Sequence, residues 1–81
     1  MIDQDILRKT MAANVVRLRR ERGLSQEELA GRCGISRVYL ARIETAKNTI
    51  GADVLYTLAD VLGVPADTLR QVSEAAVSKS A

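Results

Sequence analysis

The chain lacks histidine, tryptophan and phenylalanine, and it has a single cysteine and a single proline among its 81 residues. Without histidine, Ser-His and Cys-His catalysis, histidine-based acid–base chemistry and most zinc sites are excluded. Cys33 alone cannot form an internal disulfide or an all-thiolate metal site, which favours a reducing, cytoplasmic setting. Its only aromatic residues are two tyrosines, so the core is expected to be aliphatic. These absences predict no enzyme, no metal site and no cofactor.

Long apolar segments are also missing. No run of about 18 apolar residues is present, so no transmembrane helix is expected. The N-terminus has no basic start followed by an apolar stretch, so no secretory signal and no membrane contact are expected. The length predicts one domain over residues 1–81, with an ordered core at about 4–76 and a frayed C-terminal tail.

Basic side chains are concentrated in the first half of the chain. Residues 8–47 carry ten basic and four acidic side chains, whereas residues 48–81 carry two basic and four acidic ones. Most of the basic residues are arginines, whose planar guanidinium groups suit forked contacts with phosphate and guanine. The first half is therefore the place to seek a polyanion partner, although a solvated, arginine-rich helix face accounts for the same charges.

Apolar residues recur at helical spacing between the glycines and the proline. Leu7, Met11, Val15 and Leu18 form one such stripe. No stretch alternates between apolar and polar residues for long enough to predict a strand. The pattern therefore predicts an all-α fold with five helices around a Leu/Val/Ile core, at about residues 4–22, 25–34, 37–45, 51–63 and 65–72.

Residues 26–45 carry the most specific pattern, two short helices joined by a tight turn that contains glycine. Ala30 must be small because the second helix crosses close to it. Gly34 is placed where the turn needs a positive φ, which a side chain resists. Apolar residues hold the two helices at a steep angle, so that the second projects from the surface; they are Leu29, Cys33, Ile35, Leu40 and Ile43.

This stretch resembles the helix-turn-helix of the phage repressor and Cro family, often called Xre-like. The matching residues are Leu24-Ser25-Gln26-Glu27-Glu28-Leu29-Ala30, Gly34-Ile35-Ser36, Leu40 and Ile43-Glu44, with a later match at Leu58-Ala59 and Leu62-Gly63-Val64. The resemblance extends over roughly residues 10–70. It implies a five-helix, phage-repressor-like domain that binds double-stranded DNA through a helix-turn-helix at about residues 25–45.

The resemblance implies that the exposed side of the third helix contacts base edges or adjacent phosphates in the major groove. Arg37 and Arg42 are the best candidates for forked contacts to guanine, and Val38 for a thymine methyl group. Tyr39 is expected to face the DNA and not the core. A solvated helix face remains the alternative for the whole set, which is Ser36, Arg37, Val38, Tyr39 and Arg42.

Further residues are candidates for contacts with DNA phosphates, and for Arg17 a solvated side chain is the alternative. Gln26 is implied both to bond a phosphate and to buttress the third helix. The other candidates are Ser25, Arg17, Thr45, Lys47, Asn48 and Thr49. After the third helix the family often has glycine, basic residues and proline, whereas this chain has neither glycine nor proline there, so the shape of that loop is not predicted.

Two kinds of contact are implied within and between chains. Arg19 and Glu44 match a structural ion pair between the first and third helices. A homodimer is also implied, on an inverted-repeat operator with half-sites about 34 Å apart. The candidates for its interface are Tyr56, Val61, Leu69, Val72 and Ala76, of which Leu69 is more readily assigned to the core.

Stand-alone domains of this length resemble Cro-like phage regulators and the controller proteins of restriction–modification systems. The resemblance thus implies a transcriptional regulator that represses or activates, with RNA polymerase as a partner if it activates. No small-molecule ligand is evident. The alternative is an antitoxin or co-regulator whose main role is to bind another protein.

Overall fold

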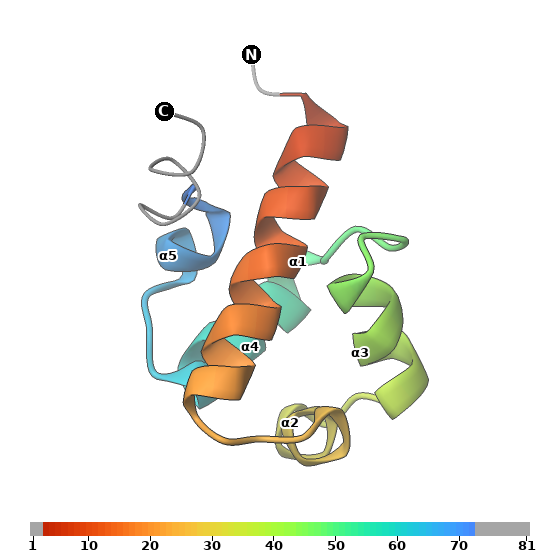
Figure 1. Ribbon diagram of the computed structural model, residues 1–81, viewed down its shortest axis with the longest axis vertical. Helices are drawn as coiled ribbons and strands as arrows, with labels where there is room; N and C mark the ends of the chain where they lie inside the picture. The colour runs from red at the N-terminus through yellow and green to blue at the C-terminus, as the bar shows by residue number, and fades with distance from the viewer. Residues whose placement is uncertain (1–2, 73–81) are drawn as a thin grey trace.

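Five α-helices follow one another in the part of the chain that the computed structural model describes, residues 3–72, and no strand occurs there (Figure 1). They are α1 (Gln4–Glu21), α2 (Gln26–Cys33), α3 (Arg37–Glu44), α4 (Ala52–Leu62) and α5 (Ala66–Arg70). The predicted all-α fold is therefore confirmed. Among the same residues, no helix is both long enough and apolar enough to cross a membrane.

Local capping fixes both ends of α2. The Ser25 hydroxyl accepts a hydrogen bond from the Glu28 amide at 3.0 Å, and the Glu28 carboxylate accepts one from the Ser25 amide at 2.9 Å. The bond from the Ser25 amide lowers the pKa of Glu28, so this stabilisation is present at neutral pH and is lost as the pH falls through that lowered pKa. At the other end, Gly34 has a φ of 70° in the left-handed region, as the sequence predicted.

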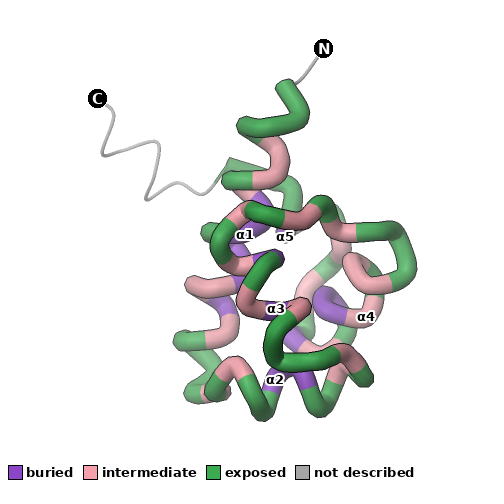
Figure 2. Tube along the Cα trace, turned by 90° about the vertical axis from the view of Figure 1, so that its right-hand side faces the viewer, coloured by how far each residue is buried: buried purple, intermediate pink, exposed green. Residues whose placement is uncertain are grey.

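Aliphatic side chains fill the core, in agreement with the scarcity of aromatic residues. α1 is the central element, with α5 packed on one side of it and α3 on the other (Figure 1). The buried segments lie where the helices meet, and the outer turns are exposed (Figure 2). Every helix contributes to the set of largest fully buried side chains, which is Val15, Leu29, Leu40, Ile43, Leu58, Leu62 and Leu69.

Asn14 is a polar residue inside this apolar core, with 3% of its surface exposed. Its Nδ2 group donates to the carbonyl oxygens of Leu69 at 2.8 Å and Gln71 at 2.7 Å, and it lies 3.3 Å from the carbonyl oxygen of Thr68. The last carbonyls of a helix lack partners within the helix. One side chain of α1 therefore caps α5, and the backbone at Gln71 is already extended.

The fifth helix is shorter than the sequence pattern predicts. A helix through Val72 is wrong, because α5 ends at Arg70 and Val72 lies beyond it with 58% of its surface exposed. Leu69 is fully buried, so it closes the core and offers no surface to a second chain. Ala76, and with it the last part of the expected ordered core, lies outside the described residues.

The turn after α3 contains an alanine in a conformation that favours glycine. Ala46 has a φ of 60°, in the region where an L-residue costs roughly 1–2 kcal/mol. Its amide donates to the carbonyl of Ile43, and the next amide, of Lys47, donates to the carbonyl of Arg42 at 2.9 Å. The chain thus makes a glycine-type turn at the position where the family often has glycine.

Replacing Ala46 by glycine is expected to stabilise the protein. Relief of the left-handed backbone strain outweighs the loss of about 0.5–1 kcal/mol that glycine costs through chain entropy. We expect the free energy of unfolding, measured by urea denaturation, to rise by about 0.5–1 kcal/mol.

Ala13→Gly is the matched control, because Ala13 is exposed in the middle of α1. There the same substitution is expected to cost about 1 kcal/mol. Equal destabilisation by both substitutions would contradict the strain assigned to Ala46.

Candidate nucleic-acid interface

The two sides of α3 differ in burial (Figure 2). Leu40 and Ile43 are buried, whereas Arg37, Val38 and Arg42 are exposed, Val38 with 61% of its surface. Among residues 3–72, Arg37 forms no ion pair. α3 therefore presents two guanidinium groups and one apolar side chain to solvent, a combination that suits base edges in a major groove.

The first turn of α3 places Ser36 and Tyr39 differently from these residues. Ser36 is the N-cap, and its hydroxyl oxygen accepts a hydrogen bond from the Tyr39 amide at 3.0 Å. Tyr39 is half-buried and packs against the hydrophobic core, so the expectation that it faces away from the core is wrong in part. It lies next to Leu40 at the border of the buried side, and its ring is large enough to reach the core.

An ion pair joins the end of α1 to the end of α3. Arg19 Nε donates to Glu44 Oε2 at 2.7 Å, and Arg19 Nη2 donates to Glu44 Oε1 at 3.1 Å. The side chains are 12% and 4% exposed, so water screens the pair poorly. Arg19 Nη1 also donates to the carbonyl oxygen of Leu24 at 2.8 Å, which ties the loop between α1 and α2 to the same group. The ion pair implied by the family resemblance is thus present.

Gln26 brings the start of α2 to this end of α3. Its Nε2 donates to Glu44 Oε1 at 3.0 Å, which is a contact of the buttressing kind that the resemblance implies. Ser25, the N-cap of α2, is exposed beside it. The N-terminal end of α2 carries free backbone amides and a partial positive charge. The N-terminal end of α2, whose first turn also carries the Glu27 and Glu28 carboxylates, therefore lies next to the C-terminal end of α3.

The loop between α3 and α4 starts at the same end. Thr45 Oγ1 donates to the carbonyl oxygen of Ala41 at 2.9 Å, and Asn48 Oδ1 accepts from Arg42 Nε at 3.1 Å. Lys47 and Thr49 are exposed. Two of the four candidate phosphate contacts in this loop, Thr45 and Asn48, therefore already have partners within the protein.

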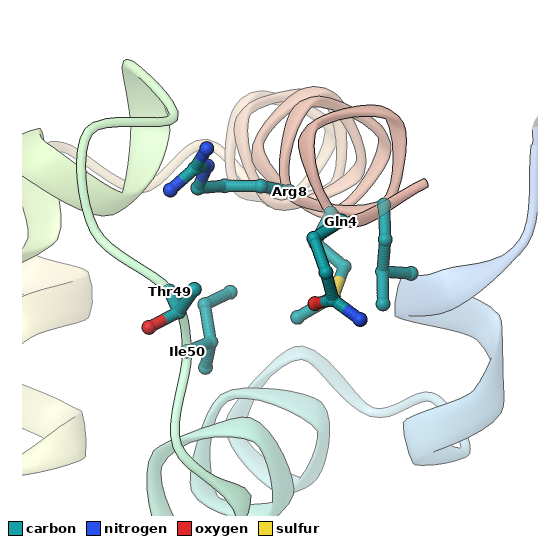
Figure 3. A pocket seen from close by; sticks show the side chains of 6 residues that line it. Gln4, Arg8, Thr49 and Ile50 are labelled. Atoms are coloured by element: carbon teal, nitrogen blue, oxygen red, sulfur yellow. The ribbon is translucent and has the colours of Figure 1, made fainter. Parts of the chain in front are cut away.

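The first half of α1 lines a hollow beside this loop. Arg8 extends from α1 toward the segment that carries Thr49 and Ile50, and Gln4 lies on the opposite wall (Figure 3). The Arg8 guanidinium pairs with Asp5, one turn earlier in α1. Arg8 thus adds a cation to the same side of the molecule as the loop.

Arg17, also on α1, does not lie beside this loop. It pairs with Glu21 at 3.2 Å, and its Nη2 is 3.5 Å from Asn14 Oδ1. Asn14 contacts α5, and α3 lies on the opposite side of α1 (Figure 1). The position of Arg17 therefore does not support the implied phosphate contact.

Two residues with clear roles were not predicted from the sequence. Asn14 caps α5, as described above, and Arg22 Nε donates to the carbonyl oxygen of Leu62 at 2.7 Å, which caps α4. The available signals were an asparagine within the apolar stripe of a helix and an arginine at a helix end. Neither signal identifies the hydrogen-bond acceptor, because both acceptors are main-chain carbonyls far along the chain.

No metal or thiol chemistry is indicated in the described part of the chain. Residues 3–72 contain no group of three or more His, Cys, Asp or Glu side chains that could hold a metal ion. Cys33 packs against the core, and burial raises the pKa of its thiol. The thiol therefore stays protonated at neutral pH and serves as a small apolar side chain.

Removing the Glu44 carboxylate is expected to destabilise the fold strongly. Glu44→Ala leaves the poorly exposed Arg19 guanidinium and the Gln26 amide without their acceptor. Breaking a buried pair in this way costs about 3–5 kcal/mol. Urea denaturation should therefore show a loss of about 3 kcal/mol or more in the free energy of unfolding.

Glu21→Ala is the control, since it breaks only exposed ion pairs, one with Arg17 and one with Arg22, whose side chains are 37–52% exposed. We expect this control to cost less than about 1 kcal/mol. If both variants lost the same small amount, the Arg19–Glu44 pair would have no special structural role.

Comparison with known proteins identifies the family. The sequence profile of the HTH_3 family, described as helix-turn-helix, matches residues 15–69. An HTH-type transcriptional regulator of Sinorhizobium fredii, y4dJ, is 45% identical over 58 residues, which cover 72% of this chain and 75% of that protein.

Solved structures agree with this match. A hypothetical transcription factor from Neisseria is 34% identical, with a TM-score of 0.83 over 95% of this chain and 85% of that one. The restriction-modification controller protein C.AhdI from Aeromonas hydrophila is 27% identical, with a TM-score of 0.74 over 76% of this chain and 94% of that one. The profile match covers more than half of the chain and includes α2 and α3. We conclude that this chain belongs to the HTH_3 family of helix-turn-helix proteins, whose fold is that of DNA-binding transcriptional regulators.

Proposed function

We propose that this protein is a sequence-specific transcriptional regulator that binds double-stranded DNA as a homodimer and has no enzymatic role. The observation that carries the proposal is the arrangement of α3. Its buried side is anchored by Leu40 and Ile43, while Arg37 and Arg42 extend from the exposed side. Guanidinium groups on a projecting helix suit forked contacts with guanine in the major groove.

The proposed phosphate contacts surround the C-terminal end of α3. Gln26 and Ser25 stand at the start of α2, where free amides favour an anion. Lys47 and Thr49 are exposed in the loop after α3, near Arg8 of α1. Contacts of this kind fix the position of the protein on DNA and carry no sequence information themselves. Thr45 and Asn48 are the weaker members of this set, because their backbone amides already donate to the carbonyl oxygens of Ala41 and Arg42.

The proposed dimer surface lies on α4 and the segment after α5. Tyr56 and Val72 are large apolar residues with 66% and 58% of their surface exposed. Val61 is partly buried against the core, so it contributes less area. An inverted-repeat operator follows from two-fold symmetry, with each α3 in one half-site.

A role as the controller of a restriction–modification system is the more specific form of this proposal. Its support is the likeness to the Aeromonas hydrophila controller protein, which spans nearly all of that shorter chain. Such a regulator controls a promoter by its position on the DNA. If the protein activates transcription, we expect it also to contact RNA polymerase.

Arg37→Ala tests whether α3 contacts bases. If Arg37 forms a forked contact with guanine, its removal should cost about 1–3 kcal/mol of binding free energy and relax the preference at one position of the site. The measurement is a binding titration at physiological salt, with duplexes that vary one base pair at a time.

Arg32→Ala removes the same charge from an exposed position on α2 and serves as the control. It should leave the order of preference among duplexes unchanged. Unchanged binding of Arg37→Ala to the preferred duplex would contradict the assignment of Arg37.

A further inference from the structure

The loop after α3 folds back onto Arg42 at both its main chain and its side chain. The Arg42 carbonyl oxygen accepts hydrogen bonds from the amides of Lys47 at 2.9 Å and Asn48 at 3.4 Å. The Arg42 Nε group donates to Asn48 Oδ1 at 3.1 Å. Arg42 is therefore held by Asn48 through two separate groups, while Arg37 has no ion-pair partner among residues 3–72.

The left-handed turn at Ala46 makes this contact possible. With a φ of 60°, Ala46 turns the chain back toward the last turn of α3. The amides of Lys47 and Asn48 then face the Arg42 carbonyl, and the Asn48 side chain reaches the guanidinium group. The position of Asn48 is thus fixed by backbone bonds and does not depend on its side chain.

The bond to Nε leaves the outer edge of the guanidinium group free. A guanidinium carries five N–H donors in one plane, and no hydrogen bond within residues 3–72 engages Nη1 or Nη2 of Arg42. A guanidinium held at Nε presents this outer fork in one orientation before DNA arrives. Such pre-organisation lowers the conformational entropy lost on binding.

We propose that Asn48 is a positioning residue that orients the Arg42 guanidinium for base recognition. The proposal rests on the proposed function, and it gives the Asn48 side-chain oxygen a role separate from any phosphate contact made through Nδ2. Phosphate oxygens are hydrogen-bond acceptors, so the Asn48 oxygen that binds Arg42 is an atom that a phosphate cannot use.

Binding titrations with the full chain test this role, on the duplex that the unaltered protein selects from a random pool. Arg42→Ala first identifies the base pair whose preference depends on Arg42. Asn48→Ala should lower the preference for that same base pair by about three- to tenfold, the effect of one hydrogen bond. In the Arg42→Ala background, Asn48→Ala should cause no further loss of preference.

Two further variants separate positioning from phosphate binding. Asn48→Asp keeps the oxygen acceptor, so the preference at that base pair should be retained although the added charge weakens binding to every duplex. Thr49→Ala, at the adjacent exposed position, should lower binding to all duplexes by the same factor. A thermal unfolding curve for each variant is the control that it is folded.

Several outcomes would overturn the proposal. One is an equal loss of binding to all duplexes for Asn48→Ala, as is expected for Thr49→Ala. A second is full additivity of the effects of Asn48→Ala and Arg42→Ala. A third is an unchanged preference at every base pair for Arg42→Ala, because Arg42 then needs no positioning. If the unaltered protein selects no motif at all, the proposed function fails and this proposal falls with it.

Discussion

The side of the molecule that faces DNA in our proposal depends on the ion pair between Arg19 and Glu44. Three side-chain donors converge on the Glu44 carboxylate, two from Arg19 and one from Gln26, and the carboxylate is 4% exposed. Because these donors come from α1 and α2, the pair fixes the end of α3 relative to both helices. The pair also neutralises the negative charge of Glu44, which would otherwise repel phosphates beside α3.

With the end of α3 fixed, the loop that follows begins from a defined position. The left-handed residue Ala46 and the two amides on the Arg42 carbonyl then direct the chain toward α4. This brings Lys47 and Thr49 to the side on which Arg8 also lies. The Glu44 carboxylate is thus buried against its partners. The basic side chains of α3 and of the loop after it stay exposed to solvent.

Features encoded by local rules could be predicted from the sequence. The capping box at Ser25 and Glu28 and the left-handed Gly34 depend on residues a few positions apart, and the structure contains both. The Arg19–Glu44 pair came from the family resemblance, because spacing alone does not match one arginine with one of several glutamates. On α3, burial of Leu40 and Ile43 followed from helical periodicity, but the partial burial of Tyr39 depends on how far its ring reaches.

The features that could not be predicted involve partners set by the tertiary fold. Asn14 donates to a carbonyl 55 residues further along the chain, and this contact accompanies the early end of α5. Arg22 caps α4 through the carbonyl of Leu62, which any residue at that position would supply. The bond between Asn48 and Arg42 requires the left-handed turn at Ala46, for which alanine gives no signal.

Selection of binding sites from a random pool of duplexes, at about physiological salt, tests the central claim most directly. These conditions suppress sequence-independent phosphate binding. The account predicts recovery of an inverted repeat whose half-sites are centred about 34 Å apart, one helical turn of DNA. Recovery of no motif would contradict it, and would favour a role in which the main partner is another protein.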